Sequence, residues 1–169
     1  MKQTLIASFL FSFLLSGCGS SPDPLKLEGN WIGSRYESNL SVDSQEQTQV
    51  RNWSEVNGSI YIFRNSRYKE IAGGEIGSAE DLHLSGNNYY RVDGNFLVLE
   101  SPNAQPQRYE IMKLNNELLR LRMDLTRGNV RGSVTITFTR VDGRRFDQIM
   151  VDRQRAERTQ SAPRCMWDL

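Results

Sequence analysis

The sequence predicts an all-β domain, an antiparallel up-and-down barrel of about eight strands followed by a short C-terminal helix. From residue 27 onward, apolar residues recur mainly with period two, the spacing of residues on one face of a strand. Turn signals interrupt these runs at short intervals, as in a meandering sheet. The chain has 169 residues, which suits one such domain with a modest core and a targeting segment.

The amino terminus has the pattern of a signal peptide. Met1 and Lys2 provide a short positive start, and the apolar run over residues 5–15 follows directly. This run has roughly ten residues, whereas a helix needs about 20 to span a bilayer. We therefore assign residues 1–17 to a cleaved signal peptide.

The end of the apolar run suggests a point of lipid attachment. Leu15, Ser16, Gly17 and Cys18 resemble the lipobox of bacterial lipoproteins, in which a peptidase cuts before the cysteine after its sulfur has received a diacylglycerol. The resemblance implies that Cys18 is the lipid-attachment residue, later acylated with fatty acids such as palmitate, and the first residue of the mature protein. The alternative is an ordinary secretory signal cleaved elsewhere, with Cys18 lost or paired with Cys165.

The residues after Cys18 bear on where the protein is sorted. Gly19 and Ser20 follow it, which resembles lipoproteins sent to the outer membrane, since an Asp at this place favours inner-membrane retention in the familiar Gram-negative type. We expect an outer-membrane lipoprotein facing the periplasm of a bacterial envelope, with the membrane as a partner through its lipid. Residues 18–26 form the lipidated N-terminus and a short Pro-containing tether.

Residues 27–142 carry the strand signals of the barrel. One strand alternates charged residues with the apolar set Leu119, Leu121, Met123 and Leu125. The next places Val134, Ile136, Phe138 and Arg140 on one face and threonines on the other. Tight hairpin turns are predicted at 57–58, 93–95 and 115–116, where Asn, Asp and Gly tolerate a positive φ.

A second resemblance concerns the two ends of this domain. Its first strand opens "LEGNWIGSRYES", with Gly29 two residues before Trp31, and its last strand, "VTITFTRV", has Arg140 near its close. This is similar to the lipocalin and lipocalin-like superfamily, in which a basic residue stacks on the tryptophan of a Gly-x-Trp motif. The resemblance implies that Gly29, Trp31 and Arg140 close the barrel as structural residues. In the alternative, Trp31 is a core residue of another β-sandwich.

The carboxy-terminal segment, residues 143–169, changes period. Phe146, Ile149 and Met150 fall at helical spacing, so we expect a short amphipathic helix that covers one side of the sheet or binds a partner. Asp142 is placed to cap its start. If Cys18 is acylated, Cys165 is either buried or available for an intermolecular disulfide.

The residues needed for catalysis or metal binding are scarce. His83 is the single histidine, so no pair of imidazoles can hold zinc. Its place near a turn, in "EDLHLSGNN", favours a solvent-facing side chain over a catalytic base. No glycine-rich phosphate loop is recognisable. We therefore predict no catalytic residue, no metal site and no cofactor, and a protein that is not an enzyme.

Charge argues against nucleic acid as a partner. The chain has 21 basic and 20 acidic residues, and loss of Lys2 with the signal peptide leaves 20 of each. No overall field then attracts a polyanion.

Two binding functions remain. The first is a small apolar ligand or lipid inside the barrel, which requires a cavity above about 300 Å³. The alternative is a protein-interaction module, such as an inhibitor, an immunity factor or an envelope-assembly accessory, with a filled barrel. Aromatic residues of the middle strands suit either a pocket or a packed core.

Overall fold

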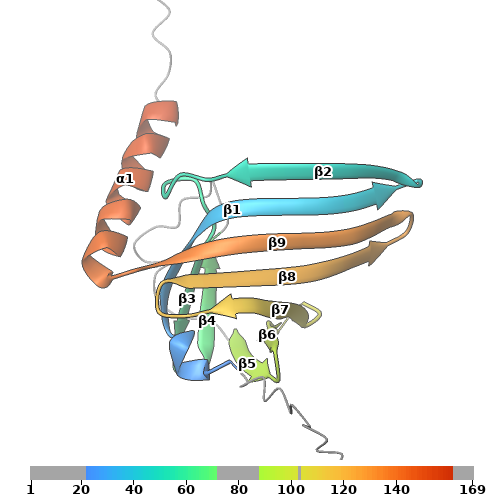
Figure 1. The fold of residues 1–169 in the computed structure, drawn as a ribbon. Helices are drawn as coiled ribbons and strands as arrows, with labels where there is room; N and C mark the ends of the chain where they lie inside the picture. Colours follow the sequence, from blue (N-terminus) through green and yellow to red (C-terminus); the bar gives the residue numbers. More distant parts are fainter. Residues whose placement is uncertain (1–21, 72–87, 103, 162–169) are drawn as a thin grey trace, which may run out of the picture.

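The computed structural model describes residues 22–71, 88–102 and 104–161. It contains a short 3₁₀ helix η1, nine strands and one helix α1 (Figure 1). Their bounds are η1 Pro24–Lys26, β1 Gly29–Val42, β2 Gln45–Asn52, β3 Ile60–Arg64, β4 Arg67–Ile71, β5 Tyr89–Asp93, β6 Phe96–Glu100, β7 Gln107–Leu114, β8 Leu118–Arg127, β9 Val130–Val141 and α1 Gly143–Ser161. The predicted fold class is confirmed.

Eight of the strands close into an antiparallel barrel, and β2 lies outside the ring. The strand order is β2-β1-β3-β4-β5-β6-β7-β8-β9, and β9 also pairs with β1. Among the described residues, β4 and β5 pair over a short length, with Arg67 opposite Tyr89 as their one register pair. Closure by β1 and β9 is extensive and runs from Asn30 opposite Val141 to Val42 opposite Val130.

The predicted hairpin at Asn57-Gly58 is wrong. β2 and β3 do not pair with each other, because both lie along the same edge of β1, one after the other. Gly58 is needed for a different reason: a Cβ there would lie 2.0 Å from the carbonyl oxygen of Gly33. The hairpins predicted at 93–95 and 115–116 are confirmed as the β5–β6 and β7–β8 connections.

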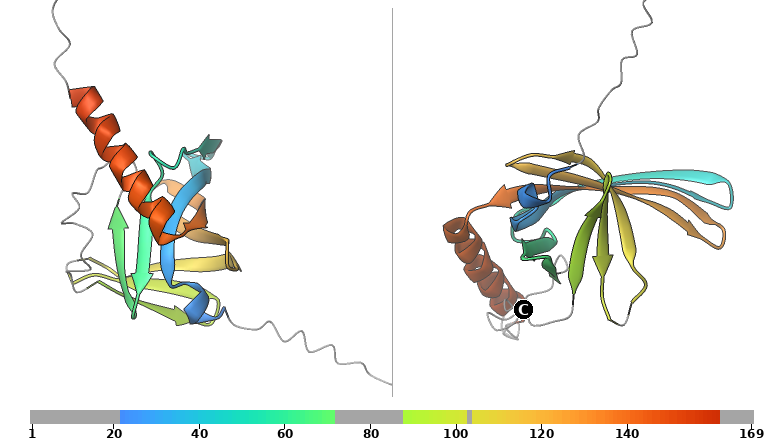
Figure 2. Two further views of the ribbon diagram at one scale, coloured as in Figure 1. Left: turned by 90° about the vertical axis from the view of Figure 1, so that its left-hand side faces the viewer. Right: turned by 90° about the horizontal axis from the view of Figure 1, so that it is seen from below.

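The barrel is packed on both sides of its wall. Thirteen buried residues form the interior cluster. A second cluster joins the outer face of the wall to α1, which lies on the side away from the tips of β1 and β2 (Figures 1 and 2). Its buried members are Ile32, Ile60, Ile62, Ile71, Phe146, Ile149 and Met150. The helical spacing seen in the sequence thus marks the face of α1 that packs on the barrel.

Polar contacts fix the start and the middle of this helix. The Asp142 carboxylate accepts a hydrogen bond of 2.8 Å from the backbone N–H of Arg145, as expected of an N-cap. Farther along, the guanidinium of Arg153 is buried and donates to the carbonyl oxygens of Glu55 and Gly58. Burial lowers the pKa of Arg153. This arginine ties α1 to the connection between β2 and β3.

At the end of the barrel next to η1, Arg140 stacks on Trp31. The guanidinium carbon lies 4.6 Å from the centre of the indole ring, and the indole N–H donates to the carbonyl of Leu27 at 2.7 Å. Gly29, at φ 139°, lies beneath the guanidinium, because a Cβ there would be 3.5 Å from the same carbon. Arg140 also donates to the carbonyl of Lys26. One cation therefore links the last strand, the first strand and η1.

We predict that Arg140→Met lowers the free energy of unfolding by about 2 kcal/mol, the typical value of a partly desolvated cation–π contact. Arg131→Met is the matched control, because Arg131 is an exposed residue of the same strand, and it should change stability by less than about 0.5 kcal/mol. Urea denaturation of the two variants measures both values. Equal losses would show that the stack adds nothing specific.

Candidate functional site: the projecting arm

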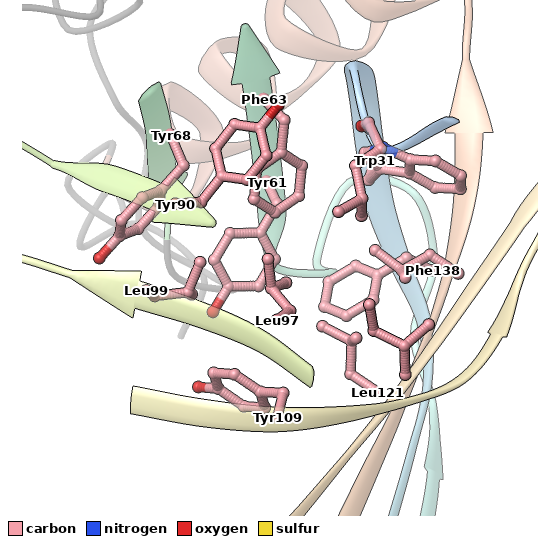
Figure 3. Close-up of a cluster of buried hydrophobic side chains, with 13 residues drawn as sticks. Trp31, Tyr61, Phe63, Tyr68, Tyr90, Leu97, Leu99, Tyr109, Leu121 and Phe138 are labelled. Atoms are coloured by element: carbon pink, nitrogen blue, oxygen red, sulfur yellow. The ribbon is translucent and has the colours of Figure 1, made fainter. Parts of the chain in front are cut away.

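The barrel interior is filled by aromatic and aliphatic side chains. Figure 3 shows rings from several strands gathered against Trp31 and Phe138. Tyr61 meets Phe138 with ring centres 5.2 Å apart, and Phe63 meets Tyr90 at 4.9 Å, both close to edge-on, a favoured aromatic geometry. Both Phe63 and Phe138 are completely buried. Among the described residues, the space that a small apolar ligand would need is occupied by protein.

Several polar side chains of the interior form hydrogen bonds with one another. The Tyr109 hydroxyl donates to Gln107 at 2.6 Å, and the hydroxyls of Tyr68 and Ser101 are 2.9 Å apart. Burial raises the pKa of Tyr61 far above its ordinary value, and the neighbouring Tyr109 and Glu70 raise it further. The phenol therefore stays neutral at any physiological pH and offers no activated nucleophile.

Glu70 stands directly opposite Tyr61 in the β3–β4 pairing. Partial desolvation raises its pKa, while a hydrogen bond with Tyr61 acts in the other direction. In the described part of the chain, Glu70 is therefore a hydrogen-bond partner of the Tyr61 phenol.

The residues singled out in the sequence separate into two groups. Gly29, Trp31 and Arg140 come together at the η1 end of the barrel, where they hold the wall closed. Cys18, His83 and Cys165 lie outside the described residues. Within the described ranges, no three His, Cys, Asp or Glu side chains are grouped closely enough to hold a metal ion. No described helix has the length and apolar character to cross a bilayer.

The most distinctive feature is a four-stranded arm that extends beyond the barrel (Figure 1). We define the arm as residues 35–52 and 123–137, which form β2 and the outer parts of β1, β9 and β8 in that order across the sheet. β7 pairs with β8 only as far as Glu110 opposite Arg122. Beyond this point β8 continues without β7, and β5 to β7 diverge from the arm (Figure 2).

A bulge marks where β1 leaves the barrel. The register with β9 shifts between Gly33 and Arg35, so Ser34 is the extra residue. Before the bulge β1 pairs with β3, and after it with β2. The backbone N–H of Trp53 donates to the Ser34 carbonyl at 2.9 Å, and the Trp53 ring covers Gly33, leaving only 3.0 Å for a Cβ. The bulge therefore allows β1 to belong to the barrel wall before Ser34 and to the arm after it.

The two faces of the arm differ in character. Register places Leu40 opposite Gly132 and Gly132 opposite Leu125. This face is mostly apolar along three strands, and Arg127 lies at its outer end. Its apolar residues are Tyr36, Leu40, Val42, Met123, Leu125, Val130, Val134 and Ile136. All but the buried Val134 are half-buried. We call this surface the inner face, since Met123 and Ile136 pack against the interior cluster.

The outer face of the arm is mostly polar, with the exposed Val50 of β2 as its one large apolar residue. Glu37 binds Arg35 at 2.6 Å and Arg120 at 2.7 Å. Asn39, adjacent to Leu40 in the chain, is exposed on this face and accepts a hydrogen bond of 2.8 Å from Thr48. This surface is an ordinary solvated face of a sheet, so the candidate binding surface is the inner one.

The arm ends in two hairpins that are joined to each other. Asp43 and Ser44 form the β1–β2 turn at φ 50° and 67°, a left-handed conformation that costs non-glycine residues about 1–2 kcal/mol each. The Asn129 side chain, from the β8–β9 turn, donates to Asp43 at 2.6 Å. A groove of about 540 Å³ near this tip is lined mainly by polar residues of the outer face, among them Asn39, Thr48 and Arg131.

The sequence contains part of the signal for the arm. The alternation over residues 119–125 and 134–140 is longer than the five residues of each of the strands β3 to β6. It predicted the strands, but it did not show that their outer parts have no barrel partner. No family model matches the chain, and no curated protein matches it.

Proposed function

We propose that the protein is a lipid-anchored component of the bacterial envelope that binds a protein partner through the inner face of its arm. It acts by binding and not by catalysis. The anchor is Cys18 at the end of the lipobox-like Leu15-Ser16-Gly17, and it holds the domain at the outer membrane on the periplasmic side.

The filled interior is the observation that carries this proposal. A lipocalin-like barrel that carries a small apolar ligand needs a cavity, and here aromatic rings pack at about 5 Å from one another. Packing of this kind favours a protein-interaction module over the carriage of a ligand in the barrel. The inner face of the arm is the candidate surface for that interaction, because seven partly exposed apolar residues lie there on three neighbouring strands.

The short tether supports a partner located at the membrane. Asp23 is the fifth residue after Cys18, and its carboxylate caps η1 by accepting a hydrogen bond from the backbone N–H of Leu25. Five residues span at most about 18 Å. A lipid on Cys18 would therefore hold the η1 end of the barrel close to the bilayer, and the arm would meet partners in a thin layer next to the membrane.

The anchor is tested by labelling with a radioactive fatty acid in the native host. We expect the wild-type protein to be labelled and to remain with the membrane fraction, because Cys18 is the acylated residue. Cys18→Ala should lose the label, and Cys165→Ala should keep it. Equal labelling of the wild type and Cys18→Ala would overturn this part of the proposal.

The binding surface is tested with a photoreactive amino acid placed at Leu40 or at Asn39. These neighbours lie on opposite faces of the same strand. The two variants therefore place the photoreactive group at the same point along the arm but on different faces. We expect irradiation of intact cells to give one discrete protein adduct from position 40 and none from position 39. Identical adducts from both positions, or no adduct from position 40, would contradict the proposed use of the inner face.

A further inference from the structure

The end of the barrel next to η1 carries two exposed apolar side chains, Leu25 and Met112. Leu25 is 77% exposed, the most of any large apolar side chain among the described residues, and Met112 is 50% exposed. We infer that this end of the barrel is the membrane-contacting face of the protein, and that Leu25 and Met112 enter the lipid bilayer. The inference rests on the proposed function, because the lipid on Cys18 brings the bilayer to this end.

Leu25 is exposed on a turn that the barrel holds in place. The Asp23 carboxylate accepts a hydrogen bond of 3.0 Å from the Leu25 N–H, and the last carbonyl of η1 accepts one from Arg140. Two residues after Leu25, Leu27 is completely buried, and its carbonyl accepts the hydrogen bond of the Trp31 indole. The contacts that bury Leu27 therefore hold Leu25 outside the core.

A bulge in β7 exposes Met112. The register between β7 and β8 shifts between Ile111 and Lys113, which pair with Leu121 and Arg120. Met112 is therefore the extra residue, and it has no partner on β8. Because a bulge redirects the side chain that it carries, Met112 is exposed while the preceding Ile111 stays buried.

Met112 lies beside the point where the tether enters the domain. It lines a groove of about 380 Å³ together with Pro22, Asp23 and Lys26 of the first described segment. Pro22 is the fourth residue after Cys18, and four residues reach at most about 14 Å. The bilayer that holds the lipid of Cys18 must therefore come within this distance of the groove. It is the large apolar phase that lies closest to both exposed side chains.

Two side chains are enough for docking because the lipid already holds the protein at the membrane. Transfer of one leucine or methionine side chain out of water raises a binding constant by roughly ten- to a hundredfold. Two together would bind at most about as well as a single myristoyl chain, whose constant of about 10⁴ M⁻¹ gives only reversible binding. A short tether presents the face to the bilayer at a local concentration on the order of millimolar. We therefore expect the face to dock when Cys18 carries its lipid.

Charge does not select the lipid at this face. Lys26 and Lys113 line the groove, and so does Asp23, while Glu117 lines a second groove with Lys26. These two basic and two acidic side chains balance one another, so we expect docking on zwitterionic lipid. The apolar stems of the lysines can lie along the bilayer surface with their ammonium groups in water.

The membrane-contacting face leaves the arm accessible. η1 precedes the first residue of β1, Gly29, and the β1–β2 turn at the arm tip follows its last residue, Val42. The two features therefore lie at opposite ends of one strand of 14 residues (Figure 1). A protein docked through η1 still presents the inner face of its arm to a partner.

The test uses the lipidated mature protein in phosphatidylcholine nanodiscs, with Cys165→Ala so that the lipid occupies the one remaining native thiol. A bimane fluorophore is attached to Leu25→Cys or Met112→Cys. Val50→Cys and Val151→Cys are matched controls, because these valines of β2 and α1 are 51% and 48% exposed. Brominated phosphatidylcholine, a quencher, should cause loss of fluorescence at positions 25 and 112 and none at 50 and 151. Equal quenching at all four positions, or none at 25 and 112, overturns the inference.

A second measurement needs no fluorophore. Hydrogen exchange at the amides of residues 25–27 and 112–116 should be slower in the lipidated protein in nanodiscs than in the Cys18→Ala protein in solution. The expected slowing is at most about tenfold, because it is limited by the weak binding constant and the local concentration. The double variant Leu25→Glu and Met112→Glu, lipidated and in nanodiscs, should lose this protection.

The matched double control is Val50→Glu with Val151→Glu, which should keep the protection. Protection that survives the glutamates at positions 25 and 112, or that the control also loses, overturns the inference. If the fatty-acid label on Cys18 is present in that case, the proposed anchor stands without the docked face. Absence of the label from the wild type would instead remove the anchor, and the inference with it.

Discussion

The pairing of β1 with β9 is the interaction on which the rest of the structure depends. It runs from Asn30 opposite Val141 to Val42 opposite Val130, and it passes from the barrel into the arm with one bulge at Ser34. At one end it brings Arg140 onto Trp31 and closes the wall. At the other it carries two hairpins beyond the barrel and presents their apolar face. The same strand pair therefore closes the barrel at one end and forms the centre of the arm at the other.

A filled barrel changes what such a fold can do. Aromatic side chains that would line the pocket of a hollow barrel here pack against one another with their rings edge-on. The buried phenol of Tyr61 stays neutral next to Tyr109 and Glu70. The interior then contributes stability, and the binding that we propose uses the surface of the arm. Extension of β1, β8 and β9 past the core provides that surface at low cost, because each strand is already ordered by the barrel.

Much of the fold follows from local patterns in the sequence. Period-two runs located β8 and β9, Asp142 marked the start of α1, and the spacing of Phe146, Ile149 and Met150 identified its packed face. The Asn57-Gly58 hairpin failed because a turn signal shows where the chain can reverse, not which strand it then pairs with. The arm was missed for a related reason: alternation gives the faces of a strand, but the length over which a neighbour accompanies it is a tertiary property.

The central claim is that the arm, and not the barrel interior, is the part that binds. Amide hydrogen exchange of the protein in its native membranes, compared with the purified protein in nanodiscs of the same lipids, tests it most directly. The account predicts slower exchange in the arm, residues 35–52 and 123–137, in the native membranes, with unchanged exchange in β3 and β6. Slowed exchange confined to the barrel strands, or identical profiles in the two preparations, would contradict it.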